Sequence, residues 1–253
     1  MKLKIFVLSI CLLLNLTHAD DKGYLVAKKS QEANNGFIGE RNFMEMHLIN
    51  ANNDKIIRKM NSKIQEKQNE GDRSIISFEW PLDVKGVKML TWSHKEDDDD
   101  QWLYLPSIKR IKRISSSNKS GSFMGSEFSY EDFSSQEIEK YNYRYIKDEE
   151  FNKRKTEVIE RTTKDQNSGY TKQIIWMDKE YLNPIKIDYY DRKSELLKTA
   201  HFLKYKKIKK WWRAMEMEMI NHQTKKRSII IWNKRDLEVT FQEQEFNKDN
   251  LVK

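Results

Sequence analysis

Apolar side chains recur at every second position in many parts of the sequence, and this period constrains the fold more than any other feature. Met44, Met46 and Leu48 alternate with Glu45 and His47. The same alternation occurs in the segments Ile76–Trp80, Tyr141–Tyr145, Ile185–Tyr189 and Met215–Met219. Because successive side chains of a β-strand point to opposite faces of its sheet, each segment predicts a strand with one apolar and one polar face.

Further strands are predicted between clusters of Asn, Asp and Ser, which form the turns in a chain with only eight Gly and three Pro. These strands cover Lys55–Lys67, Val87–His94, Gln101–Leu105, Tyr170–Met177, Glu195–Tyr205, Arg227–Asn233 and Glu238–Phe246. Strands that follow one another through short polar turns pair as an antiparallel meander. A single curved sheet with one apolar face predicts one domain, a barrel or half-barrel of about eleven strands.

Two segments predict helices. Lys22–Asn34 has the pattern of an amphipathic helix that ends before Gly36. Gly125–Phe133 predicts a shorter helix with Ser126 as its N-cap. The rest of the chain predicts strands and turns, so the expected fold class is mainly β with few helices.

The N-terminus has the order of features that is typical of a secretory signal peptide. Lys2 and Lys4 precede the apolar run Ile5–Leu14, and Thr17-His18-Ala19 ends in a small residue suited to cleavage. The apolar run is far shorter than the roughly 20 residues that a membrane-spanning helix needs. We therefore predict a signal peptide at residues 1–19 and a single secreted domain at residues 20–253.

The region from Gly71 to Phe133 contains the most specific motifs of the chain. They are GDR at 71–73, IISFEWP at 75–81, DVKG at 83–86, QWLYLP at 101–106, KRIKRI at 109–114, SFMGS at 122–126 and FSYEDF at 128–133. In this order they resemble the outer-membrane lipoprotein-sorting protein family, which is related to the LolA/LolB-like periplasmic lipoprotein carriers. The flanking regions agree with that family in strand pattern and order.

This resemblance implies a half-open antiparallel β-barrel in the periplasm, with helices covering an apolar concave face that accepts acyl chains. It implies a carrier of lipoproteins or other acylated lipids for sorting or transport to the outer membrane. The implied partners are the acylated cargo, an inner-membrane exporter and an outer-membrane acceptor, and we expect a monomer. An accessory or sensor protein of a lipid exporter is the alternative that the same fold allows.

Large apolar side chains on the predicted strands and in the SFMGS motif are the candidate wall of the lipid cavity. These residues are Phe78, Trp80, Leu90, Trp92, Trp102, Tyr104, Phe123, Met124, Trp176, Met215 and Met217. Large and adaptable side chains suit irregular apolar ligands. The same residues are also compatible with a packed core, and the sequence leaves that alternative open.

Four basic residues follow a predicted strand end and are candidates for contact with lipid headgroups or a partner protein: Lys109, Arg110, Lys112 and Arg113. A solvated surface run is the alternative interpretation of this cluster.

The acidic run Asp97–Asp100 predicts a solvated hairpin tip, because it lacks the spaced ligands and the Gly of a calcium loop. The remaining polar residues form no zinc, phosphate-loop or nucleophile motif, so we expect no metal, no cofactor and no enzymatic activity.

A secreted polyanion-binding protein is the remaining alternative, since the formal net charge is +8 and aromatic residues are frequent. Acidic residues are mixed with the basic ones throughout the chain, however, so no continuous basic face is evident. We therefore expect no binding to nucleic acid.

Overall fold

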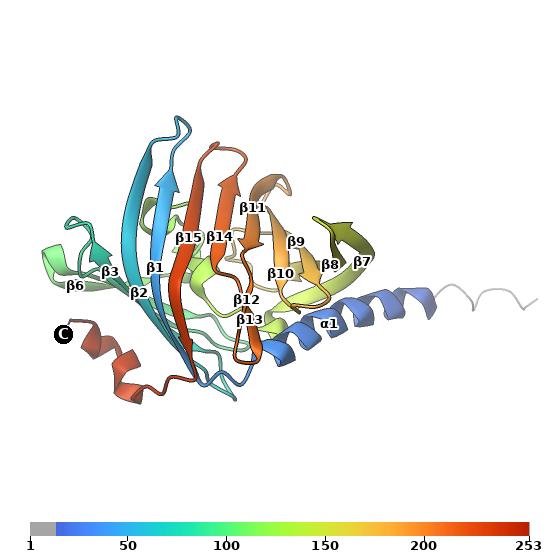
Figure 1. The fold of residues 1–253 in the computed structure, drawn as a ribbon, viewed down its shortest axis with the longest axis horizontal. Helices are drawn as coiled ribbons and strands as arrows, with labels where there is room; N and C mark the ends of the chain where they lie inside the picture. Colours follow the sequence, from blue (N-terminus) through green and yellow to red (C-terminus); the bar gives the residue numbers. More distant parts are fainter. Residues whose placement is uncertain (1–13, 253) are drawn as a thin grey trace, which may run out of the picture.

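Strands with alternating apolar and polar positions build one large antiparallel sheet, as their period predicts (Figure 1). The computed structural model describes residues 14–252. Its first half contains α1 (Leu14–Asn34), β1 (Gly39–Ile49), β2 (Lys55–Gln65), β3 (Arg73–Trp80), β4 (Lys88–Trp92), β5 (Asp100–Leu105) and β6 (Arg110–Ile114). Its second half contains β7 (Tyr141–Phe151), β8 (Arg154–Thr163), β9 (Lys172–Asp178), β10 (Pro184–Tyr190), β11 (Leu196–Leu203), β12 (Lys206–Ile208), β13 (Trp211–Arg213), β14 (Glu216–Asn221) and β15 (Arg227–Leu237).

Thirteen strands form the sheet in the order β6-β5-β4-β3-β2-β1-β15-β14-β11-β10-β9-β8-β7. The first six strands form one meander and the others a second meander, which returns until β15 pairs with β1. The edge strands β6 and β7 do not pair with each other within the described residues. The sheet is therefore an open, LolA-like half-barrel, and the predicted fold class is confirmed.

The chain passes from β6 to β7 through residues 115–140, which we call the crossing segment. It contains the short 3-10 helices η2 (Ser116–Asn118), η3 (Phe123–Gly125), η4 (Tyr130–Phe133) and η5 (Ile138–Lys140). Phe123 and Phe128 of this segment are buried in the main core, against side chains of the sheet. Val26 and Ala27 place α1 in the same core. The crossing segment and α1 thus cover the concave face of the sheet (Figure 1).

The C-terminal segment covers part of the opposite face. It contains the 3-10 helices η6 (Glu243–Phe246) and η7 (Lys248–Val252). One further 3-10 helix, η1 (Pro106–Ile108), lies between β5 and β6. Phe246 and Leu251 are almost fully buried against β4 and β5. The sheet therefore has an apolar core on each side at this place.

The predicted elements agree with the structure in most places. The predicted helix Lys22–Asn34 lies within α1, whereas Glu238–Phe246, predicted as a strand, is an irregular segment that ends in η6. Four strands were missed: β6, β8 and the short pair β12 and β13. In β8 a polar Thr156 and a charged Arg161 are buried, so its apolar residues lack a clear period of two.

The predicted helix Gly125–Phe133 consists of separate turns. Met124 and Gly125 have φ angles of 50° and 76°, in the left-handed region, so no α-helix starts at Gly125. The predicted N-cap Ser126 donates its hydroxyl to the carbonyl of Phe123 at 2.7 Å. Ser129 is the residue that caps η4, in a capping box with Asp132.

The predicted apolar run of the signal peptide lies almost entirely outside the described residues, and cleavage after Ala19 stays a prediction. None of the helices within residues 14–252 is both long and apolar enough to cross a membrane.

Candidate ligand-binding cavity

A cavity of about 470 Å³ lies between α1, the crossing segment and the second meander of the sheet. The apolar part of its sheet wall includes Ile159, Ile175, Met177, Ile187, Phe202 and Met217. These side chains alternate with outward-facing ones along β8 to β11 and β14, so the period of two produces the apolar wall. The volume lies in the range of roughly 300–1,000 Å³ that is typical of small-molecule sites.

A second cavity of about 270 Å³ adjoins the first one on the concave face. Its apolar wall comes from the first meander and β15, and includes Met44, Ile76, Ile230 and Trp232. Asp72, Asp132 and Ser135 border both cavities. The second cavity therefore spans the seam where β1 meets β15, and the first one lies beside it on the second meander.

The centre of the concave face is filled by Phe123 of the crossing segment. Its ring lies 4.4 Å from the ring of Phe133 and 5.7 Å from the ring of Phe78, measured between centroids. The carbonyl of the next residue, Met124, accepts a hydrogen bond from Arg58 of β2. A side chain at Gly125 would meet no atom within 4 Å. The η3 turn thus places an aromatic side chain in the core and has open space beside it.

Buried polar side chains on β8 and β11 interrupt the apolar wall. The guanidinium of Arg161 donates from Nε to Oε1 of Gln173 at 2.8 Å and from Nη2 to Oε1 of Gln136 at 2.6 Å. Beside it, Lys198 donates to the hydroxyls of Ser129 at 2.8 Å and Tyr170 at 3.1 Å. These contacts place a band of buried polar side chains next to the apolar wall.

Carboxylates gather at the border of the larger cavity. Glu66, Glu70, Asp72, Glu137 and Glu139 line it, together with Lys67 and Lys95. Burial raises the pKa of Asp72 to about 7, and the negative charges of Glu137 and Glu66 act in the same direction. Burial also raises the pKa of Glu137, which accepts a hydrogen bond from the Ser135 hydroxyl at 2.8 Å. The border of this cavity is therefore acidic in a chain whose net charge is positive.

The structure places four of the predicted cavity residues on this side of the sheet. Met217 lines the larger cavity, and Phe78, Phe123 and Met124 belong to the core that adjoins both cavities. Phe78 and Phe123 are almost fully buried. Of these four residues, only Met217 lines one of the two cavities.

Four other predicted residues lie on the opposite face of the sheet: Leu90, Trp92, Trp102 and Tyr104. They pack against the C-terminal segment, and the indole of Trp92 donates to the carbonyl of Phe246 at 2.8 Å. Their neighbours Met89 and Leu103 face the concave side instead. Because β4 and β5 are apolar on both faces, their alternation does not reveal which face is concave.

Three further predicted residues do not border either cavity. Trp176 lies between the inward-facing Ile175 and Met177 and bonds to Glu149 at 2.8 Å. Trp80 is 49% exposed at the end of β3. Met215 precedes β14 and is partly buried. Alternation thus turns Trp176 outward, and the other two lie beyond the strand segments that face the cavities.

The predicted basic cluster follows the end of β5, as expected, and most of it belongs to the edge strand β6. Lys109 precedes this strand, whereas Arg110, Lys112 and Arg113 belong to it and are exposed. Positive charges on an edge strand oppose pairing with another sheet.

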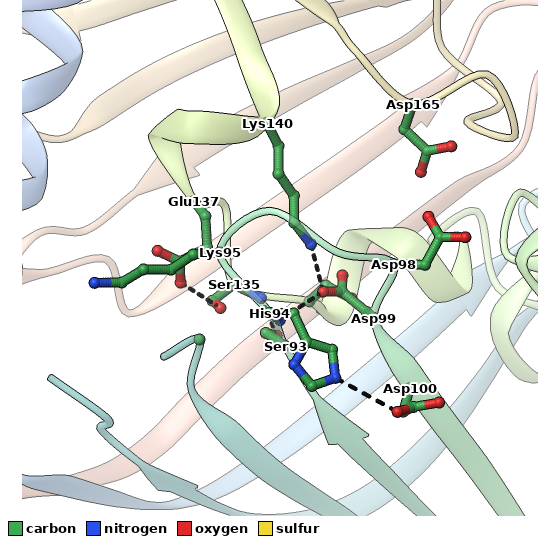
Figure 2. Close-up of polar contacts among 12 residues, drawn as sticks. Ser93, His94, Lys95, Asp98, Asp99, Asp100, Ser135, Glu137, Lys140 and Asp165 are labelled. Atoms are coloured by element: carbon green, nitrogen blue, oxygen red, sulfur yellow. Dashed lines mark hydrogen bonds and ion pairs between the residues drawn. The ribbon is translucent and has the colours of Figure 1, made fainter. Parts of the chain in front are cut away.

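The acidic run forms a hairpin tip between β4 and β5 in which Asp97 and Asp98 are exposed, as predicted, whereas Asp99 and Asp100 make ion pairs (Figure 2). Asp99 bonds to Lys140 of η5 at 2.5 Å, and Asp100 lies 3.4 Å from His94. These contacts link the hairpin to the crossing segment. No group of His, Cys, Asp and Glu in the described part of the chain could hold a metal ion.

Arg161, Tyr143 and Tyr189 line the larger cavity, and sequence reasoning did not select them. Tyr143 and Tyr189 belong to segments with the predicted period, which was a usable signal for their position on the inner face. Arg161 had no such signal, because a charged residue in a strand is normally assigned to the solvent face.

Comparisons with known proteins agree with this architecture. The protein family whose pattern matches residues 70–253 is described as "-like: Uncharacterized protein". No curated protein matches the chain. An outer membrane lipoprotein-sorting protein domain from Vibrio parahaemolyticus is 45% identical, with a TM-score of 0.91 over 92% of this chain and 100% of that one.

Two other solved structures are similar over most of their length. A DUF1329 family protein from Desulfovibrio piger is 28% identical, with a TM-score of 0.88 over 92% of this chain and 99% of that one. A LolA superfamily protein from Nitrosomonas europaea is 18% identical, with a TM-score of 0.72 over 90% of this chain and 98% of that one. The open sheet, the covered concave face and the identity to the Vibrio domain lead to one conclusion: the chain belongs to the outer membrane lipoprotein-sorting protein family, within the LolA-like fold.

Proposed function

We propose that this protein is a periplasmic carrier that binds the acyl chains of lipoproteins or other lipids without changing them chemically. The observation that supports this function best is the cavity of about 470 Å³ with its apolar wall on the concave face. Each CH₂ group that moves from water into such a cavity contributes about 0.8 kcal/mol, so even part of an acyl chain binds usefully. The relative from Vibrio parahaemolyticus, named for lipoprotein sorting, favours the same function.

In this proposal the signal peptide at residues 1–19 directs the chain to the periplasm, and the carrier acts between an exporter in the inner membrane and an acceptor in the outer membrane. The exposed basic residues Arg110, Lys112 and Arg113 then contact lipid headgroups or an acidic face of a partner. Ile108 beside them is 51% exposed and adds apolar area to this surface. Substitution of the three basic residues by Gln tests this contact by binding to vesicles with anionic lipids.

Release of the cargo requires that the apolar space be refilled, and we assign this role to the η3 turn. Phe123 occupies the core between the strands, and Gly125 has open space around it. A swing of this turn moves an aromatic ring into or out of the space that an acyl chain would use.

Titration with a fluorescent fatty-acyl probe tests the carrier function. We expect the wild type to bind the probe and M217E to bind it at least tenfold more weakly, because a carboxylate then faces the apolar wall. The matched control is I220E, which introduces the same charge on the outward face of the same strand. Absence of probe binding to the wild type, or equal binding by M217E with its fold intact, contradicts the proposal.

A further inference from the structure

A buried guanidinium that no described carboxylate contacts lies in the wall of the larger cavity. Arg161 is only 7% exposed and points to the concave side, as does Ile159 on the same strand. Its hydrogen bonds go to the neutral side chains of Gln173 and Gln136, and its charge lies 4.1 Å from the centre of the Tyr141 ring. Among the side chains of residues 22–252, no carboxylate oxygen lies within 4.0 Å of this guanidinium.

The second buried cation of this band has its own counter-ion. Lys198 lies 4.0 Å from Asp132, and Tyr170 donates a hydrogen bond to that carboxylate at 3.0 Å. The charge of Asp132 also acts on Arg161 without direct contact, and Glu137 at the cavity border accepts a hydrogen bond from Ser135. Of the two cations in the buried band, Lys198 alone has a carboxylate within 4.0 Å among the side chains that the structure describes.

A buried charge that no carboxylate contacts is costly, and an anion that reaches Arg161 would reduce this cost. A guanidinium suits such an anion because its planar N–H groups match carboxylate and phosphate oxygens. Nη1 of Arg161 donates to neither glutamine, and the Tyr143 hydroxyl is a further polar neighbour of the guanidinium. The geometry therefore leaves part of the guanidinium for a ligand.

Apolar wall residues lie directly beside this cation. Ile159 is two residues from Arg161 on β8, and Ile175 is two residues from Gln173 on β9, a separation of roughly 7 Å along each strand. Met177 and Met217 extend the apolar wall of the same cavity. The lining therefore has a cationic part next to an apolar part, which matches a chain with an anionic end.

We propose that the cavity selects acyl ligands whose polar end is an ionised carboxylate or phosphate, and that Arg161 binds this group. The inference rests on the carrier function proposed above and names the chemical class of its ligand. It distinguishes this ligand from acyl chains with uncharged ends, which meet only the apolar wall.

Competition against a bound neutral fluorescent probe tests the proposal with ligands of one chain length: dodecanoate, dodecyl phosphate and dodecanol. We expect at least one of the two anions to displace the probe from the wild type about tenfold more effectively than dodecanol does. A preference for dodecanoate alone identifies a carboxylate ligand, and a preference for dodecyl phosphate alone identifies a phosphate ligand. R161Q should lose the preference and keep its affinity for dodecanol, and R161K should keep a smaller preference.

The matched control is R144Q, which removes an exposed arginine from the outward face of the neighbouring strand β7 and should leave the preference unchanged. Equal displacement by all three ligands in the wild type overturns this inference and leaves the carrier function intact. Failure of every ligand to displace the probe, or of the probe to bind, overturns both. If R161Q does not fold, a preference in R161K equal to that of the wild type overturns the inference, and a reduced one supports it.

Discussion

At the scale of single residues, Asp72 connects the cavity to the pH of its surroundings. This residue borders both cavities, and burial raises its pKa to about 7 from an ordinary value of 3.8. The folded protein therefore binds a proton at this site at pH values where the unfolded chain has already lost it. By linkage, Asp72 makes the folding free energy less favourable as pH rises from about 4 to about 7, with no further change above that range.

We expect D72N to remove this contribution, so the variant should gain stability relative to the wild type as pH rises from about 4 to about 7. Urea denaturation at several pH values measures the difference between the two proteins. Both proteins contain the other carboxylates, such as Glu131, whose pKa is also raised by burial, so the contributions of these groups to the pH dependence cancel in the difference. A constant difference between wild type and variant over this pH range would show that Asp72 titrates normally.

At the scale of elements, the C-terminal segment packs on the outer face of β4 and β5 and covers its apolar side chains. Trp102, Leu90 and Phe246 form one cluster, in which Phe246 has no exposed surface. Ion pairs of Glu243 with Lys67 and Arg73, at 2.8 Å each, fasten the segment to the sheet. This element stabilises the fold, so substitutions in the cluster should lower stability more than they change ligand binding.

F246A should therefore lower the free energy of unfolding by about 3–5 kcal/mol and leave the affinity for an acyl probe unchanged. V252A is the control, because this side chain is 52% exposed and its loss should cost less than about 0.5 kcal/mol. Urea denaturation and probe titration on the same samples separate the two effects. Reduced probe affinity in a folded F246A would place the outer cluster in the ligand site.

Truncation of the aromatic side chain in the η3 turn, unlike truncation of Phe246, should change ligand affinity. F123A should lower the free energy of unfolding by about 3–5 kcal/mol but increase probe affinity, because it vacates space beside the cavities. F43A serves as the control, since Phe43 on β1 is 41% exposed. Unchanged probe affinity in a folded F123A would mean that the ring does not compete with the ligand.

The elements also show what the sequence could predict. The alternation of apolar and polar residues predicted most strands, since each of them has one face toward the core. It did not assign the concave face in β4 and β5, where Leu90 and Met89 are both buried on opposite sides. It missed β8, whose inner face contains Arg161, because a buried cation depends on partners from β9 and the crossing segment that sequence spacing does not reveal.

At the scale of the whole molecule, chain order explains how the cavity arises. The pairing of β1 with β15 joins two meanders into one sheet, while the crossing segment passes over its concave face. The edges β6 and β7 stay apart in the sheet order, so the barrel is open and its inner face is lined by helices and loops instead of a closing strand. An open barrel of this kind can hold a ligand where a closed barrel of similar size would hold only side chains.

The proposed carrier function therefore depends on one property of the entire molecule, its ability to retain an acyl ligand under native conditions. Native mass spectrometry of the protein isolated from the periplasm of its own cell measures this directly. We expect a population whose added mass corresponds to an acylated species, and the same preparation of M217E should lack it. Wild-type protein that carries no acylated species, and acquires none when mixed with the lipids of those cells, would contradict the central claim.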